Sequence, residues 1–296
     1  MVTERGDTLE FTGERFTPEC VREIWYEHWH RYAFAMPLCR DKRVLDAACG
    51  EGYGSDLLAG VAAEVLGLDI SETAVAHARK RYGNRDKLHF EAGDASALGF
   101  DDACFDVVVS FETLEHLEAQ DRLVAGFARV LREDGLLLIS SPDKRTYSEI
   151  AGFRNEFHVR ELYREELLEL LGRHFPHVRL YAQKLLFQSA LWSLDGGGQG
   201  SLLQTASVDG SGVEAGLAYA PLYYVAVCSR QPLPAGLPAT AWFGDKEEAV
   251  YTHYNGEVRK NMNAGARIAE LEAEIERLRQ STASRPPSRW LRWLRR

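Results

Sequence analysis

Residues 44–54, VLDAACGEGYG, decide the fold expected of this chain of 296 residues. They form an apolar run that ends in an acid and is followed by alternating glycines, Gly50, Gly52 and Gly54. This pattern predicts a buried strand that ends in a glycine-rich turn and leads into a helix. Glycine is expected there because a cofactor lies against bare backbone, where a Cβ atom would collide with it and where φ can be positive.

Two further apolar runs end in acids. Residues 65–68 are followed by Asp69, and residues 88–90 are followed by Gly93 and Asp94. The carboxyl ends of parallel strands converge on one crevice, so both acids are expected to face it. Asp69, about 20 residues beyond the turn, stands where a carboxylate binds the ribose hydroxyls of an adenosine. Asp94 is then expected to accept a hydrogen bond from the exocyclic amine of the adenine.

The remaining elements continue the alternation of strands and helices. Residues 105–109 and 136–140 read as strands, with a helix over 119–131 between them that Gly135 closes. Ser71 is expected to cap another helix. The sequence therefore predicts an α/β fold, a doubly wound Rossmann-like sheet of seven strands that is mostly parallel.

A C-terminal antiparallel hairpin is expected to complete the sheet, formed by residues 178–186 and 220–229. Between them, residues 195–216 are rich in Gly and Ser, which indicates either a surface loop or part of an acceptor site. An N-terminal cap helix is expected over residues 17–36, ending at Pro37. Its apolar stripe either packs on the sheet or partly covers the bound ligands.

The series VLDAACGEGYG, LGLDIS, AGDASAL, FDVVVSFETLEH and LREDGLLLISSP resembles the ordered motifs of class I S-adenosylmethionine-dependent methyltransferases, over roughly residues 40–142. The resemblance implies that Asp46 faces the cationic amino-acid end of this cofactor. A nicotinamide-dependent dehydrogenase would instead place a pyrophosphate at the turn, where a carboxylate repels it. The residues expected to bind the cofactor are Asp46, Ala48, Gly50, Gly52, Asp69, Ile70, Asp94, Ala95, Ser110, Phe111, Arg31 and Tyr32.

Two other segments, GERFTPECVREIWYEHWHRYAFA and NEFHVREL, resemble methyltransferases encoded among polysaccharide and glycan assembly enzymes. This implies a carbohydrate or glycoconjugate acceptor, such as an O-antigen or other surface polysaccharide, a lipid-linked glycan or a nucleotide sugar. By the same likeness, Arg15, His28, Arg31 and Tyr32 are expected to approach the methionine carboxylate or the acceptor. The alternatives are a quinone or other small-molecule acceptor, and a non-catalytic scaffold that acts through its C-terminal helix.

A sugar hydroxyl is a weak acid, so methyl transfer to it calls for a general base. His116, in the phrase ETLEH, and His158, in the loop before a late helix, are both expected to face the crevice. Each could instead pack or bond locally, and Glu112 is a third candidate that either acts as the base or orients the acceptor. No compact spacing of ligands demands a metal ion, so no metal site is predicted.

Composition narrows the function classes. The formal net charge of -9 argues against a nucleic-acid partner, because phosphate contacts need clustered Lys and Arg. The five cysteines are odd in number and lack paired CxxC spacing, which suits a reducing cytoplasm. No run reaches the length of a transmembrane helix, and the N-terminus lacks a signal-peptide pattern.

The C-terminal region carries two signals. A heptad-like seam over residues 263–281 predicts a short coiled coil for a homo-oligomer or a glycan-assembly partner. Residues 285–296 join Arg to Trp and Leu, which predicts contact with the anionic inner face of the cytoplasmic membrane. The expected domains are a cap helix (1–40), a cofactor-binding domain (41–230), a linker (231–262), a short coiled coil (263–281) and a basic tail (282–296).

Overall fold

The structure is a computed structural model that describes residues 23–191, 193–194, 202–209 and 212–283. It divides into two compact units, the first ending at Phe243 and the second beginning at Gly244. Arg15, the expected helix start at Thr17 and the basic tail 285–296 lie outside the described residues.

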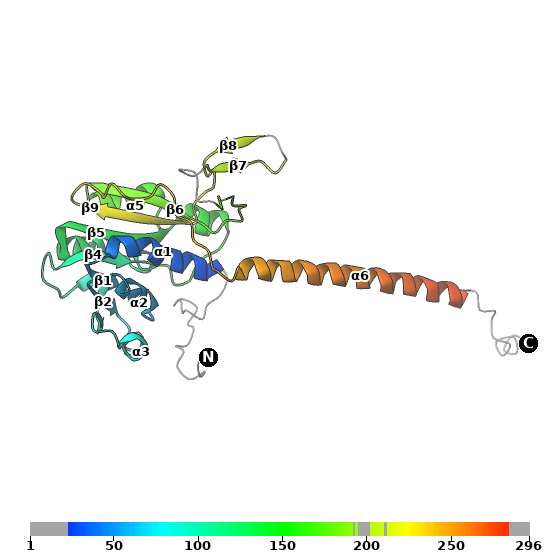
Figure 1. Cartoon of the computed structure of the whole chain (residues 1–296), viewed down its shortest axis with the longest axis horizontal. Helices are drawn as coiled ribbons and strands as arrows, with labels where there is room; N and C mark the ends of the chain where they lie inside the picture. The colour runs from blue at the N-terminus through cyan, green and yellow to red at the C-terminus, as the bar shows by residue number, and fades with distance from the viewer. Residues whose placement is uncertain (1–22, 192, 195–201, 210–211, 284–296) are drawn as a thin grey trace, which may run out of the picture. The chain divides into compact units, whose positions relative to one another are not determined.

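The first unit is built on a seven-stranded sheet, which confirms the predicted α/β architecture (Figure 1). The strand order is β3-β2-β1-β4-β5-β9-β6, and β1 to β5 run parallel. The strands are β1 (Arg43–Ala47), β2 (Glu64–Asp69), β3 (Leu88–Ala92), β4 (Phe105–Ser110), β5 (Leu131–Pro142), β6 (His177–Gln183) and β9 (Tyr223–Ser229).

Helices cover both faces of this sheet. One apolar core joins α1, α2 and α3 to one face, through buried residues such as Ala35, Leu58 and Ala78. The second core joins α4 and α5 to the other face, through residues such as Phe127 and Leu171. The helices are α1 (Glu23–Cys39), α2 (Tyr53–Ala59), α3 (Glu72–Tyr82), α4 (Gln120–Val130) and α5 (Arg164–Gly172), with short turns η1 (Ala95–Ala97), η2 (Leu114–His116) and η3 (Arg145–Ile150).

The C-terminal hairpin forms as predicted. Strand β9 lies between β5 and β6 and is antiparallel to both, so it pairs Leu138 with Val227 on one side. The helix before β5 ends earlier than predicted, because β5 already begins at Leu131. Gly135 therefore does not close a helix, and it lies in β5 close to a shift of the β4–β5 register.

Pro37 does not stop the first helix, contrary to expectation. It lies inside α1, which continues to Cys39. A proline removes one backbone hydrogen bond of a helix and can kink it, but its fixed φ is helical. Because Pro37 lies only two residues before the end of α1, this disturbance is confined to the last turn.

At the C-terminal end of the first unit, Phe243 packs against Trp25 of α1 with ring centroids 5.4 Å apart. The compact unit thus extends past the boundary at residue 230 expected from composition.

The Gly- and Ser-rich segment holds a small hairpin that the sequence did not predict, with β7 (Gln204–Ala206) paired to β8 (Val213–Ala215).

In the second unit, the helix α6 (Ala249–Ala283) includes the last part of the expected linker, residues 249–262. The coiled coil stays a prediction, and its seam residues are exposed on α6: Ile268, Leu271, Ile275 and Leu278. No helix within the described part of the chain is long and apolar enough to cross a membrane.

Candidate functional site

The glycine turn after β1 has unusual backbone geometry. Ala48, Gly50 and Gly52 have φ of 62°, 57° and 95°. A Cβ atom on Gly52 would lie 2.8 Å from the Cβ of Ala78 in α3. A Cβ atom on Gly54 would lie 2.0 Å from the ring of Tyr32 in α1. Packing inside the protein therefore requires the second and third glycines, while Gly50 borders an open cleft.

The Asp46 carboxylate lies beneath this cleft and is fully buried. It accepts hydrogen bonds from the hydroxyls of Ser55, at 2.6 Å, and Tyr32, at 3.1 Å. Burial raises the pKa of Asp46 to about 6, although both hydroxyls oppose the shift. Tyr32 lines the cleft and Asp46 does not, and the contact of Asp46 with the cofactor stays a prediction.

Asp69, at the end of β2, lines the cleft and is fixed there by two backbone groups. One carboxylate oxygen accepts from the backbone N–H of Gly50 at 2.8 Å, and the other accepts from that of Ser71 at 2.9 Å. These bonds fix the carboxylate between the glycine turn and the start of α3. Each oxygen has a second lone pair, so Asp69 can still accept hydrogen bonds from two ribose hydroxyls.

Asp94 follows β3 and lines the same cleft as Asp69. Its carboxylate accepts from the backbone N–H of Ser96 at 2.7 Å and thereby caps η1. Ala95 and Ile70 also border the cleft, and Ile70 is 75% exposed. The ends of β2 and β3 thus combine two acids with an apolar edge, a combination suited to a ribose and an adenine ring.

The end of β4 forms the opposite side. Glu112 has a φ of 51°, and its backbone N–H donates to the hydroxyl of Ser140 at 2.9 Å. Such a conformation is strained for a residue with a side chain, and strain of this kind clusters at functional sites. Phe111 packs edge-on against Tyr32 at 5.2 Å. Ser110 is fully buried and does not border the cleft.

Glu112 is held by Arg31, a buried residue of α1, through an ion pair of 2.5 Å. Burial pushes the pKa of Glu112 upward, but the charge of Arg31 and then that of His28 outweigh it, so the pKa is lowered. A carboxylate that stays ionised is a poor proton acceptor, which weakens the case for Glu112 as the base. His28 also lines the cleft, and burial together with Arg31 lowers its pKa to about 4.

His116 and His158 lie together, with ring centroids 5.2 Å apart. The Nδ1 atom of His116 is 3.0 Å from the backbone oxygen of Phe157, and that of His158 is 2.7 Å from Glu161. Of the two imidazoles, only that of His116 borders the cleft, whereas His158 lies behind it. The structure therefore separates two histidines that the sequence treated as equivalent candidates.

The cleft has a volume of about 300 Å³ and brings together most of the predicted site residues. Those predicted residues are Tyr32, Ala48, Gly50, Asp69, Ile70, Asp94, Ala95, Phe111, Glu112 and His116. The sequence did not single out several other lining residues: Cys49, Glu51, Tyr53, Gly93, Thr113 and Leu117. Most of these adjoin a predicted residue, so extending each motif by one position would have found them. His28, from the α1 stripe, also borders the cleft.

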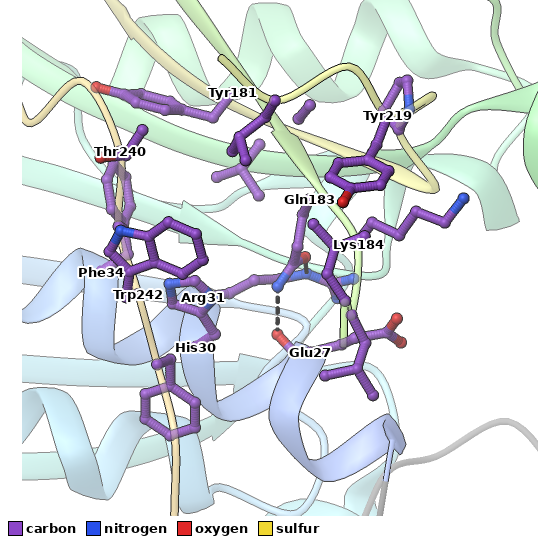
Figure 2. Close-up of a pocket in the computed structure, with 18 of the residues that line it drawn as sticks. Glu27, His30, Arg31, Phe34, Tyr181, Gln183, Lys184, Tyr219, Thr240 and Trp242 are labelled. Atoms are coloured by element: carbon purple, nitrogen blue, oxygen red, sulfur yellow. Dashed lines mark hydrogen bonds between the residues drawn. The ribbon is translucent and has the colours of Figure 1, made fainter. Parts of the chain in front are cut away.

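A second cavity of about 370 Å³ lies on the other side of Arg31, between α1, β6 and residues 239–243 (Figure 2). Arg31 lines this cavity, and its Nε atom donates to the side chain of Gln183 at 2.7 Å. Gln183 in turn donates to the backbone oxygen of Glu27 at 2.8 Å. Because Arg31 also holds Glu112, one guanidinium connects the wall of this cavity to the wall of the cleft.

Comparison with known proteins agrees with this geometry. Residues 45–139 match the family described as a methyltransferase domain. A probable S-adenosylmethionine-dependent methyltransferase of Mycobacterium tuberculosis is 43% identical over 166 residues, covering 55% of this chain and 60% of that protein. A ubiquinone biosynthesis O-methyltransferase of Sinorhizobium medicae is 30% identical over 122 residues, covering 41% of this chain and 49% of that protein.

The fold is also found among solved structures. A chain from the complex between the Haloferax volcanii Trm112 methyltransferase activator and a putative methyltransferase aligns with a TM-score of 0.52 and 20% identity, covering 70% of this chain and 89% of that one. Residues 45–139 are thus similar in sequence to a methyltransferase domain, and the sheet has the Rossmann-like fold found in a solved methyltransferase chain. The chain spans 60% of the length of the mycobacterial relative.

Proposed function

We propose that this protein transfers a methyl group from S-adenosylmethionine to an oxygen of an acceptor bound beside His116. The observation that carries this proposal is the single cleft that holds Asp69 and Asp94 on one side and Glu112 and His116 on the other. The cofactor supplies an electrophilic methyl group on its sulfonium. The strand ends fix its adenosine, so the methyl group is directed to the side where His116 lies.

Methyl transfer is an in-line displacement, so alignment of the acceptor oxygen supplies much of the rate. His116 is placed to act on that oxygen. Its Nδ1 faces a carbonyl oxygen, which only accepts hydrogen bonds, so the neutral ring carries its proton on Nδ1. The lone pair is then on Nε2, the atom that would receive the acceptor's proton. A hydroxyl acceptor therefore has a suitable partner in the cleft.

We favour a carbohydrate hydroxyl as the acceptor, in a surface polysaccharide, a lipid-linked glycan or a nucleotide sugar. The support comes from the sequence phrases that resemble glycan-associated methyltransferases. One of them, NEFHVREL, lies beside the cleft, because its Phe157 and His158 contact His116. Arg31, from the other segment, forms an ion pair with Glu112, which lines the same cleft.

A quinol or another small phenolic metabolite is the alternative acceptor. The observation that favours it is the similarity to a ubiquinone biosynthesis O-methyltransferase. A phenol ionises more easily than a sugar hydroxyl, so it depends less on a base. A non-catalytic scaffold is less favoured, since a scaffold has no need of Asp69 fixed by two backbone N–H groups.

The test measures methyl transfer from radiolabelled S-adenosylmethionine to a panel of glycans, nucleotide sugars and catechol-type quinols. Isothermal titration with S-adenosylhomocysteine gives cofactor affinity separately. Labelled sugar with unlabelled catechol supports the carbohydrate proposal, and the reverse supports the alternative. If the protein does not bind S-adenosylhomocysteine, the methyltransferase proposal is overturned and the non-catalytic scaffold is favoured.

A further inference from the structure

Three side chains with metal-binding atoms lie together beside the cleft. Glu115 and His116 belong to η2, and His158 lies in the loop between η3 and α5. One ligand atom from each residue lies within 4.8 Å of those of the other two. In a tetrahedral zinc site with bonds of about 2 Å, ligand atoms lie about 3.3 Å apart. Small side-chain rotations would therefore bring these three atoms onto one ion.

Both imidazoles have the environment that metal-binding histidines usually have. Nδ1 of His116 faces the backbone oxygen of Phe157, and Nδ1 of His158 faces the carboxylate of Glu161. An oxygen acceptor at Nδ1 fixes the proton there and leaves the lone pair on Nε2. Metal-binding histidines are commonly oriented in this way by a carbonyl or a carboxylate at the other nitrogen. Tyr147 stacks on His158 at 5.2 Å and holds its ring plane.

Glu115 supplies the second, independent observation. Its side chain is fully buried, and neither carboxylate oxygen accepts a hydrogen bond from another residue in the described part of the chain. Burial, followed by the nearby charge of Glu112, raises the pKa of Glu115 well above its usual range. Leaving a buried carboxyl group without hydrogen bonds is costly. A bound cation would compensate it.

We propose that Glu115, His116 and His158 bind a divalent transition-metal ion, with Zn²⁺ as the probe. One carboxylate and two imidazoles form a set that catalytic zinc sites use, whereas Mg²⁺ and Ca²⁺ prefer all-oxygen ligands. The sequence had predicted no metal, because the ligands are separated along the chain and His158 joins the other two only in the fold. Three protein ligands leave one coordination position open.

Because His116 borders the cleft, an ion bound to it would lie beside the proposed place of the acceptor. There the ion would bind the acceptor's hydroxyl oxygen and lower its pKa, so that the hydroxyl proton passes to solvent water as the methyl group leaves the sulfonium. His116 then acts on the acceptor through the ion and not as a direct proton acceptor. This role rests on the proposed function, whereas metal binding itself does not.

Metal binding is tested on the full chain after chelator treatment and dialysis. Titration with ZnCl₂, with the metal content measured by mass spectrometry, is expected to give one tight ion per chain. Co²⁺ should give visible absorption bands of a site with imidazole ligands. Glu115→Gln and His158→Ala are each expected to weaken Zn²⁺ binding by about tenfold or more. Neither residue borders the cleft, so both variants should still bind S-adenosylhomocysteine, which shows that they fold.

His174→Ala is the matched control, because His174 also faces a carboxylate, Asp121, but on the surface. It is expected to bind Zn²⁺ like the wild type. Equal Zn²⁺ binding by the wild type, Glu115→Gln and His158→Ala, or no binding by the wild type, overturns the site. If the site binds and chelation leaves methyl transfer unchanged, the role at the acceptor is overturned. If no methyl transfer occurs with or without metal, the proposed function is overturned. The number of Zn²⁺ ions bound per chain still shows whether the metal site exists.

Discussion

Arg31, which is buried, and Glu112, which is partly exposed to the cleft, form an ion pair of 2.5 Å between residues 81 positions apart in the chain. Arg31 is 1% exposed, and its guanidinium also lies 4.5 Å above the ring of Tyr223. The pair ties α1 to the end of β4, so it fixes one wall of the cleft in relation to the cap helix. Its geometry therefore connects the stability of the fold to the shape of the site.

Arg31→Met is expected to destabilise the protein by about 3–5 kcal/mol, since it leaves the Glu112 carboxylate without its partner. The double variant Arg31→Met/Glu112→Gln should recover part of this loss, because the uncompensated charge is gone. Chemical denaturation followed by circular dichroism measures both. Arg173→Met, at an exposed pair with Glu169, is the control and should cost about 0.5 kcal/mol or less. If the losses in Arg31→Met and Glu112→Gln simply sum to the loss in the double variant, the two side chains do not interact specifically.

Gly54→Ala is expected to be destabilising by about 1–3 kcal/mol, because the new methyl group would overlap the Tyr32 ring and force α1 outward. Gly126→Ala, inside α4, is the matched control. There the nearest atom to an added Cβ is 3.9 Å away, so the variant should be about 0.5–1 kcal/mol more stable. Thermal unfolding of the two variants should show shifts of opposite sign, and shifts of the same sign would contradict the packing argument.

Much of the cleft could be predicted from the sequence because it is made of strand ends. Asp69, Asp94 and Glu112 each follow an apolar run, and the parallel sheet brings the ends of such runs to one edge. No knowledge of distant packing is needed for this step. The same logic extends to His116, which follows β4 by a short turn.

The remaining features depend on how α1 and the loop 151–163 pack, and no local pattern encodes that packing. The resemblance implies that Arg31 approaches the methionine carboxylate or the acceptor, whereas its ion pair with Glu112 could not be predicted from the sequence. The acid in the first motif, Asp46, lies under the cleft because Tyr32 and Ser55 cover it. His158 lies behind His116 for the same reason, because the loop 151–163 packs over η2.

Asp69→Ala is expected to weaken the binding of S-adenosylhomocysteine by about 1–3 kcal/mol, because hydrogen bonds from the ribose to a charged acceptor are lost. Isothermal titration measures the change. Asp102→Ala removes a carboxylate that is 77% exposed and pairs with Arg129, so its affinity should equal that of the wild type. An unchanged affinity in Asp69→Ala would remove this residue from the cofactor site.

Asp46 should make stability depend on pH. Its folded pKa of about 6 lies above the ordinary value of 3.8, so its contribution is fully present below the ordinary pKa and is lost as pH rises through 6. Relative to Asp46→Asn, which does not ionise, the wild type should lose about 2 kcal/mol of unfolding free energy between about pH 4 and pH 7. Other titrating groups cancel in this difference. Parallel curves for the two proteins would mean that Asp46 titrates normally.

His116→Ala is expected to lower kcat by about 100-fold or more and to leave the affinity for S-adenosylhomocysteine nearly intact. The physical reason is its place in the cleft: His116 lies where we propose that the acceptor binds, and Asp69 and Gly50 lie where we propose that the adenosine binds. His174→Ala again serves as the control, with kcat equal to that of the wild type. A normal kcat in His116→Ala would show that the acceptor needs neither a base nor a bound ion at this position, which would favour a phenolic acceptor that ionises unaided.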